Sequence, residues 1–266
     1  MYNKDKIITT MMGIKKESES ILPYVVILQP RRNSSETSAQ KLDGYEGLHI
    51  DVLGYSHGFC TISGEKVDVA RNYLLEAALD SGAKYLLFVG EDTVLPYNGF
   101  TLLHEVAEKN QGAAVSGVYY IKLSSPMVHI KTGTWITPAN VDPGQIFEAW
   151  STGLDCVLIP ISTIKTIKEV EKETPFCCIG SNIDGIPFIG EDTFFCYLLR
   201  KNNFKLLVNT DVQCLHIDLE SGKYTAHPDV DLENYYTNIR ISDRLTIKDK
   251  KTIDKRWIER LPEGTV

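Results

Sequence analysis

The most informative stretch of this sequence is YLLFVGED, residues Tyr85–Asp92, in which five apolar residues lead directly into a glycine and two acids. A short apolar run bounded by turn signals is typical of a buried strand in a parallel sheet. Because ligands of open α/β sheets bind at the carboxyl ends of the strands, we expect Glu91 and Asp92 to face the binding crevice. Two interpretations of this pair stay open: a site for Mg²⁺ or Mn²⁺, or a solvated turn that caps a helix.

Strands and helices alternate on both sides of this stretch. Upstream, Tyr24–Gln29 and Leu48–Leu53 have the apolar character of strands, and a helical pattern runs over Lys66–Asp80. Downstream, the pattern predicts a helix at Phe100–Lys109 and a strand at Ala113–Tyr120. Such alternation favours a parallel sheet with helices on both faces.

The pattern becomes less regular after residue 120. Residues 122–145 are rich in Ser, Thr, Pro and Gly, which indicates loops or short antiparallel strands. Further helices are predicted at Thr163–Glu173 and from Asp192 to about Lys201, and short strands at Leu206–Val208 and Val212–Leu215. The second half is therefore expected to be mixed in its strand directions.

Composition narrows the range of functions. The 266 residues, 43% of them hydrophobic and 24% charged, suit one large α/β domain or two small ones. The formal net charge of -7 disfavours general binding to nucleic acids, because an acidic surface repels phosphate polymers. The cysteines form no C-x-x-C pair, and no apolar run approaches the ~18 residues of a membrane helix. We therefore expect a cytoplasmic protein without a transmembrane segment.

A second acidic pair, Glu191-Asp192, lies in nearly the same context as the first, IGEDTFFC against VGEDTVLP. Here the pair begins a helix, and two roles are open. Carboxylates in a first helical turn complement the helix dipole and cap free N–H groups. Alternatively, the apolar residues that follow would hold Asp192 rigidly toward the crevice as a general base.

Three other features are candidates for the same crevice. His216 follows a short apolar run in QCLHID, where it is either a structural histidine or a further metal ligand beside carboxylates. Arg71, in VARNYLL, either reaches a phosphate or lies on the surface. Pro30 and Arg31 end the first strand, the usual place for a nucleotide, although a proline there also simply terminates a strand.

Taken in order, these segments resemble glycosyltransferases of the GT-A fold, family-2-like, in particular short phage and bacterial members. The resemblance spans about Tyr24 to Asp218 and rests on YVVILQPRR, VARNYLLEAAL, KYLLFVGEDTVLP, STGLDCVLI, IGEDTFFCYLLRKNNF and CLHID. It implies a GT-A-type α/β/α sandwich with a mostly parallel central sheet and a mixed C-terminal half. One departure is Gly90, because the family's acidic motif usually begins with aspartate at this position.

The resemblance also implies an activity, a cofactor and site residues. The activity is the inverting transfer of a sugar from a UDP- or GDP-linked donor to the hydroxyl of a glycan, protein or modified nucleobase. Asp192 is implied as the catalytic base with Glu191 in support, and Asp92 and His216 as ligands of Mn²⁺ or Mg²⁺. The implied contacts to the nucleotide sugar are Pro30, Arg31, Arg71, Asn72, Gly90, Glu91 and Asp92, and those to the acceptor are Trp150, Thr152 and Gly153.

On this interpretation, residues 1–22 form a flexible leader, 23–120 a nucleotide-sugar-binding half, 121–218 the acceptor-binding and catalytic half of the same domain, and 219–266 a C-terminal extension. Two alternatives stay open. The absence of an acid at Gly90 favours a non-catalytic module that binds nucleotide sugars or glycans. A sugar-phosphate nucleotidyltransferase also uses an α/β sheet, but its basic loop after the first strand contains glycines, which Arg31–Ser35 lacks.

Overall fold

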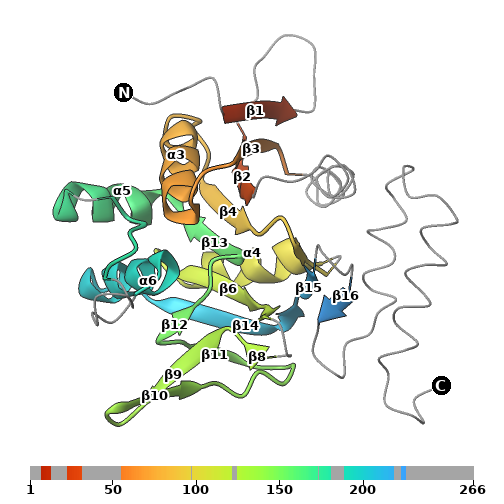
Figure 1. Ribbon diagram of the computed structural model, residues 1–266, viewed down its shortest axis with the longest axis vertical. Helices are drawn as coiled ribbons and strands as arrows, with labels where there is room; N and C mark the ends of the chain where they lie inside the picture. The colour runs from red at the N-terminus through yellow and green to blue at the C-terminus, as the bar shows by residue number, and fades with distance from the viewer. Residues whose placement is uncertain are drawn as a thin grey trace, which may run out of the picture.

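The computed structural model describes residues 7–12, 23–31, 55–96, 98–121, 125–172, 174–180, 189–218 and 223–225. They form three layers, with a large sheet between helices on its two faces (Figure 1). The strand predicted at Leu48–Leu53 lies outside the described residues, as does most of the extension at 219–266. No helix in the described part of the chain is long and apolar enough to cross a membrane.

The central sheet has eight strands, in the spatial order β1 (Ile7–Met12), β3 (His57–Ser63), β2 (Val25–Arg31), β4 (Tyr85–Val89), β13 (Cys156–Pro160), β6 (Ala114–Val118), β14 (Leu206–Gln213) and β11 (Ile146–Glu148). Strands β3, β2, β4, β6 and β14 run in one direction, and β1, β13 and β11 run in the other. The expected α/β fold class is confirmed. The sheet itself is mixed, because antiparallel β13 separates β4 from β6.

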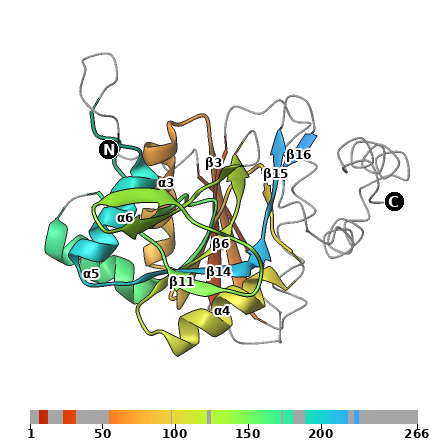
Figure 2. The ribbon, with the colours of Figure 1, turned by 90° about the horizontal axis from the view of Figure 1, so that it is seen from below.

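Helices cover both faces of this sheet (Figure 2). Helices α3 (Val67–Leu79), α5 (Ile161–Glu171) and α6 (Glu191–Lys201) pack on one face, and α4 (Gly99–Lys109) packs on the other. Each face has its own hydrophobic core.

Strand β4 contributes to both cores. Leu86 and Phe88 face the core under α3, while Leu87 and Val89 face the core under α4. Because successive side chains of a strand point to opposite faces, a strand covered on both sides is apolar throughout. This is why the uninterrupted run at 85–89 is the strand whose predicted bounds agree with the structure.

Two of the strands near the N-terminus differ from the expectation. Residues Ile7–Met12, within the expected flexible leader, form β1 and pair antiparallel with β3. The sequence of β3, HGFCTIS, does not have the pattern of a strand, because glycine and polar residues interrupt its apolar residues. It is nevertheless buried along most of its length, since it lies between β1 and β2.

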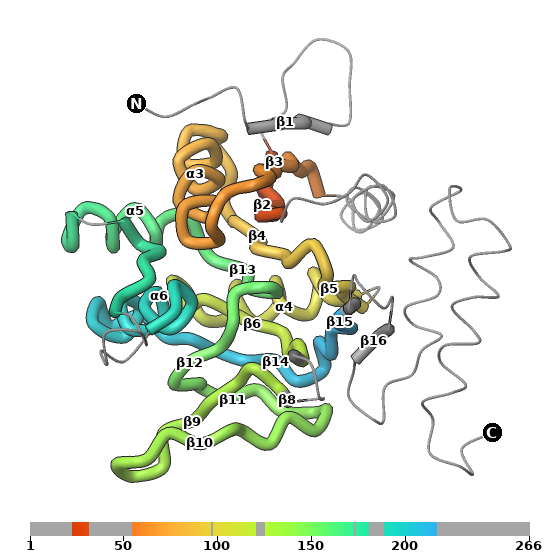
Figure 3. The backbone as a smooth tube through the Cα atoms, viewed as in Figure 1, coloured from red at the N-terminus to blue at the C-terminus, as the bar shows by residue number. Residues whose placement is uncertain are grey.

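Short antiparallel strands form between the larger elements, among them β9 and β10 in the region 122–145 where the sequence predicted loops or such strands. Strand β5 (Thr93–Val94) pairs with β15 (Leu215–Asp218), which also pairs with β16 (Lys223–Thr225). Figure 3 shows β5 and β15 together beside the end of β4. The remaining short strands are β7 (Tyr120–Ile121), β8 (Ser125–Pro126), β9 (Val128–Thr132), β10 (Trp135–Pro138) and β12 (Ser151–Thr152).

The last strands of the sheet also differ from the expectation. The two short strands predicted at Leu206–Val208 and Val212–Leu215 are instead one long strand, β14, followed by β15. The pairing of β14 with β6 shifts in register between Val208 and Gln213. A polar stretch at this irregularity interrupts the apolar pattern, which is why the sequence suggested a break.

Candidate active site

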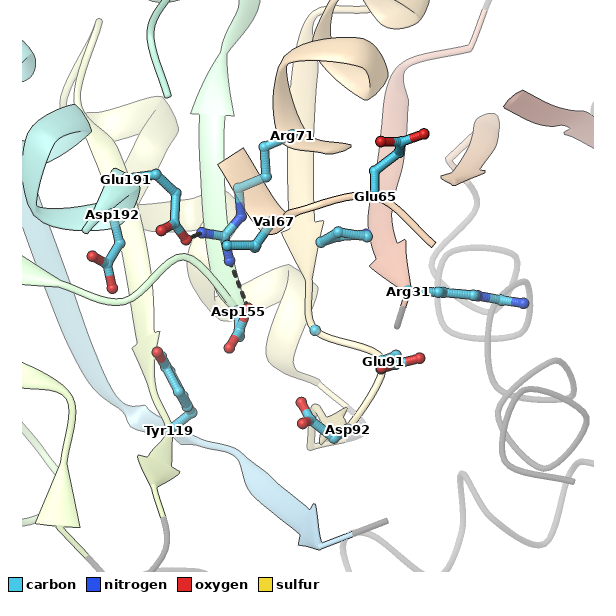
Figure 4. A pocket seen from close by; sticks show the side chains of 12 residues that line it. Arg31, Glu65, Val67, Arg71, Glu91, Asp92, Tyr119, Asp155, Glu191 and Asp192 are labelled. Atoms are coloured by element: carbon cyan, nitrogen blue, oxygen red, sulfur yellow. Dashed lines mark hydrogen bonds and ion pairs between the residues drawn. The ribbon is translucent and has the colours of Figure 1, made fainter. Parts of the chain in front are cut away.

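A cavity of about 350 Å³ opens where the carboxyl ends of β2 and β4 meet the first turns of α3 and α6 (Figure 4). The amino end of β13 reaches the same edge, because β13 runs antiparallel to β4. Ligands of α/β sheets bind at this edge. The cavity is lined by Pro30, Arg31, Glu65, Val67, Arg71, Gly90, Glu91, Asp92, Tyr119, Asp155, Glu191 and Asp192.

Most of the residues selected from the sequence come together in this cavity. They are Pro30, Arg31, Arg71, Gly90, Glu91, Asp92, Glu191 and Asp192. Four lining residues were missed: Glu65, Val67, Tyr119 and Asp155. Asp155 carries the same signal as Asp92, an acid next to an apolar strand, but it precedes its strand. Only the reversed direction of β13, which the sequence did not reveal, brings it to the cavity.

Arg71 is fixed by two carboxylates, and its burial excludes the surface position that the sequence left open. Its side chain is buried, its Nη2 donates to Asp155 Oδ1 at 2.8 Å, and its Nη1 donates to Glu191. A buried charge is tolerated when it is paired, and here one guanidinium joins α3 to β13 and α6. Arg71 therefore holds the wall of the cavity in place.

The acidic groups of the cavity influence one another's ionisation. Burial raises the pKa of Asp155 to about 6; Arg71 opposes this shift, and the charges of Asp92 and Asp192 add to it. Burial also raises the pKa of Tyr119 well above its ordinary value, with Asp155 and Asp192 contributing. Tyr119 is therefore a protonated donor at neutral pH, in a region whose negative potential favours cations.

The two acids at the start of α6 have different surroundings. Glu191 is buried, pairs with Arg71 and accepts a 3.6 Å contact from the Cys178 thiol. Asp192 is half-buried and lines the cavity, and its Oδ1 accepts the Thr193 backbone N–H at 2.6 Å. Glu191 thus fixes the helix to Arg71, whereas Asp192 presents its carboxylate to the cavity from the first helical turn.

Asp92 and His216 converge although they are far apart in the sequence. The pairing of β5 with β15 sets His216 opposite Thr93, and His216 Nε2 lies 3.3 Å from Asp92 Oδ2. His216 Nδ1 is buried and has no hydrogen-bond partner among the described residues. A carboxylate oxygen and an imidazole nitrogen are both ligands of divalent cations, so the pair fits one side of a metal site. No group of three or more such side chains is placed to hold a metal within the described part of the chain.

Four other residues selected from the sequence lie outside the cavity lining. Asn72 Nδ2 donates to the Phe176 carbonyl at 2.6 Å, which ties α3 to the segment before α6. The Trp150 ring lies under the Arg200 guanidinium at 3.9 Å, and the Thr152 hydroxyl lies 3.2 Å from Ser116 Oγ. Gly153 packs against Tyr119, which lines the cavity. A Cβ added to it would lie 1.7 Å from Tyr119 Oη, so only glycine admits the tyrosine hydroxyl there.

Comparisons with known proteins give a fold and no family. No protein-family model matches this sequence, and no curated protein matches it. Among solved structures, the chain is similar to A197 from STIV, with 18% identity over 77% of this chain and 95% of that chain and a TM-score of 0.52. This likeness shows a shared fold.

A second solved structure with some similarity is GalNAc-T7, determined with UDP, GalNAc and Mn²⁺. The match has 11% identity and a TM-score of 0.48. It covers 91% of this chain and 57% of that chain, so this protein spans less than two thirds of GalNAc-T7.

Proposed function

We propose that this protein is a glycosyltransferase that moves a sugar from a nucleoside diphosphate sugar to an acceptor hydroxyl. One observation carries the proposal: a single cavity is lined by Asp92 in one part and by Asp192 in another (Figure 4), and His216 Nε2 lies 3.3 Å from Asp92 Oδ2. Such a cavity offers separate places for a leaving group and for a proton acceptor, which are the two requirements of a displacement at an anomeric carbon.

The nucleotide half of the donor is assigned to the end of the cavity formed by β2 and β4. Pro30 and Arg31 end β2 there, and the Arg31 guanidinium is braced by Gln29 Oε1 at 2.8 Å. We assign Asp92 and His216 to a Mn²⁺ or Mg²⁺ ion, which when bound would neutralise the charge of the diphosphate. We take the donor to be a UDP- or GDP-linked sugar, as the resemblance to GT-A glycosyltransferases implies.

Asp192 is assigned as the catalytic base. In a single displacement the acceptor oxygen bonds to the anomeric carbon, the bond from that carbon to the diphosphate oxygen breaks, and Asp192 takes the hydroxyl proton. The positive end of the α6 dipole favours the ionised carboxylate that accepts this proton. Glu191 is already paired with Arg71, so its part is to hold the helix end. Attack on the face opposite the leaving group inverts the anomeric centre.

The substitution Asp192→Asn tests this assignment. It keeps the size of the side chain and removes the base, so turnover should fall by roughly 10²–10⁴-fold while donor affinity stays near that of the wild type. Turnover is measured as release of UDP or GDP from a panel of nucleotide sugars with Mn²⁺, and affinity by calorimetry. Asp80→Asn, at the exposed C-terminal end of α3, is the matched control.

The outcomes separate the candidate functions. Equal losses of affinity and rate in Asp192→Asn would make Asp192 a structural residue of α6. Binding of a nucleotide sugar by the wild type without nucleotide release, over a panel of glycan, protein and nucleobase acceptors, would favour the binding module. Release of pyrophosphate from a nucleoside triphosphate and a sugar phosphate would instead identify a nucleotidyltransferase.

A further inference from the structure

Asp155 occupies the middle of the cavity wall. It directly precedes β13, and its carbonyl accepts the Gly90 N–H at 3.0 Å, which joins it to the end of β4. In Figure 4 its carboxylate lies between those of Asp92 and Asp192, and both of these charges act on it. The acid is therefore between the two parts of the cavity that the proposed function uses.

Gly90 is the residue that makes room for this carboxylate. A Cβ added at position 90 would lie 2.9 Å from Asp155 Cγ and 3.0 Å from Asp155 Cβ. The backbone of Gly90 is not in the left-handed region, so its conformation is open to any residue. The requirement for glycine is spatial: the Asp155 side chain and Thr93 Oγ1, also at 2.9 Å, fill the volume beside the position where a residue 90 side chain would begin.

Arg71 fixes how the Asp155 carboxylate points. Its Nη2 holds Oδ1 at 2.8 Å, and the same guanidinium is anchored by Glu191. The Asp155 side chain keeps 25% of its surface exposed, compared with 4% for Arg71, and it lines the cavity. Arg71 therefore orients the Asp155 carboxylate, and the part of the carboxylate that faces the cavity can accept a hydrogen bond from a ligand.

We propose that Asp155 binds a hydroxyl group of the transferred sugar and thereby helps to select it. This inference rests on the proposed function. If Asp92 lies at the diphosphate and Asp192 at the attacking hydroxyl, both flank the anomeric carbon, and the sugar ring lies between them against Asp155. Tyr119, protonated and held close by Gly153, supplies a donor in the same wall. A partly buried, oriented acceptor of this kind discriminates against sugars that lack the matching hydroxyl.

The experiment compares free nucleotides with nucleotide sugars. Affinities of UDP, GDP, UDP-glucose, UDP-galactose, UDP-N-acetylglucosamine and GDP-mannose are measured by calorimetry with Mn²⁺, for the wild type, Asp155→Asn and the control Asp80→Asn. For the sugar nucleotide that binds best, Asp155→Asn should lose about 10-fold or more in affinity, the range for a hydrogen bond to a charged group. Affinity for the corresponding free nucleotide should change by less than about twofold, which also shows that the variant is folded.

Gly90→Ala is a second variant that disturbs the Asp155 carboxylate without removing its charge. Its methyl group would lie 2.9 Å from both Asp155 Cγ and Thr93 Oγ1, so one or both of these side chains must shift, and we expect a loss of affinity for the sugar nucleotide that is larger than the loss for the free nucleotide. If Gly90→Ala binds the sugar nucleotide as the wild type does, the spatial dependence of Asp155 on Gly90 is wrong.

Two results with Asp155→Asn would overturn the proposal. Equal losses for the sugar nucleotide and the free nucleotide would place Asp155 at the nucleotide or its cation, and unchanged affinities would remove it from the donor site. The proposed function fails separately, taking this inference with it, if the wild type binds neither nucleotides nor nucleotide sugars.

Discussion

Arg71 shows how one buried side chain organises the site. From the sequence it is an arginine on a helix before the acidic strand, which suggests a phosphate contact or a solvated position. In the structure its side chain is 4% exposed, and its guanidinium pairs with Asp155, just before β13, and with Glu191 of α6. Asp155 and Glu191 are distant in the sequence from Arg71 and from each other, so the pairing could only be learned from the fold.

Removing this guanidinium should destabilise the protein. Arg71→Met leaves two carboxylates without their shared partner, which costs about 3–5 kcal/mol for a broken buried pair. The free energy of unfolding is measured by urea denaturation. Lys168→Met is the matched control, because Lys168 and its partner Glu76 are 27% and 44% exposed and such a pair contributes at most about 1 kcal/mol. Similar losses in the two variants would contradict the structural role of Arg71.

The other site residues differ in whether the sequence alone can place them in the site. Pro30 lies at the end of β2, and Gly90 and Asp92 follow β4. Because these two strands share a direction, the rule that ligands bind at carboxyl strand ends places the three residues together. Asp155 and Tyr119 could not be found in this way. Asp155 depends on the reversed direction of β13, and Tyr119 depends on the close approach that Gly153 allows.

Strand pairing explains how His216 reaches Asp92. Neither β5 nor β15 is part of the central sheet, and their short antiparallel pairing brings the C-terminal part of the described chain back to the end of β4. The sequence contained the histidine and the acid but not the pairing, so their convergence was inferred only from the resemblance to GT-A enzymes.

The variant His216→Ala tests whether Asp92 and His216 bind a divalent cation together. If Asp92 and His216 share a cation, the variant should bind Mn²⁺ at least about 10–100-fold more weakly in the presence of UDP or GDP, because losing only the outer-shell partner of a ligand already has an effect of this size. Mn²⁺ binding is followed by electron paramagnetic resonance. His129→Ala, on β9 and outside the cavity lining, is the control. Unchanged Mn²⁺ affinity would leave His216 as a purely structural partner of Asp92.

A charged cluster between β4 and α4 gives the fold a pH dependence. Hydrogen bonds from Lys84 and Tyr85 lower the pKa of Glu108 from an ordinary 4.5 to about 2. Because the pKa is lower in the folded state, the stabilisation is present above about pH 4.5 and is lost as the pH falls toward 2.

Glu108→Gln should therefore reduce stability more at pH 7 than at pH 3. The Glu108 side chain is 41% exposed, so solvent screening limits the expected loss at pH 7 to about 1 kcal/mol or less. Urea denaturation at the two pH values measures the difference, with Glu105→Gln, exposed on the same helix, as the control. A loss that grows on acidification would have the wrong sign for this cluster.

The three-layer architecture was predictable because its main elements are strongly patterned. The apolar run of β4 and the helical spacing of apolar residues in α3 predict a sheet covered by helices. Both elements lie where the sequence predicted them. Strand order and direction were less predictable. The apolar run of β13 is the same whichever way the strand runs, and β3 is buried by its neighbours rather than by its own hydrophobicity. Pairing between distant segments, which decides the site, is not encoded in local periodicity.

If the cavity binds a nucleoside diphosphate together with a cation, the ligand should stabilise the whole domain. A ligand at 100 times its dissociation constant adds about 2.7 kcal/mol to the free energy of unfolding. For a domain of this size, each kcal/mol raises the Tm by about 2–4 °C, so UDP or GDP with Mn²⁺ should raise it by roughly 5–10 °C. Differential scanning calorimetry measures the shift. EDTA should abolish most of it, because Glu91, Asp92, Asp155 and Asp192 give the cavity a negative potential that repels an uncompensated diphosphate. A full shift that survives EDTA would mean that Arg31 and the backbone bind the nucleotide without a metal, and Asp92 and His216 would then lose the role assigned to them.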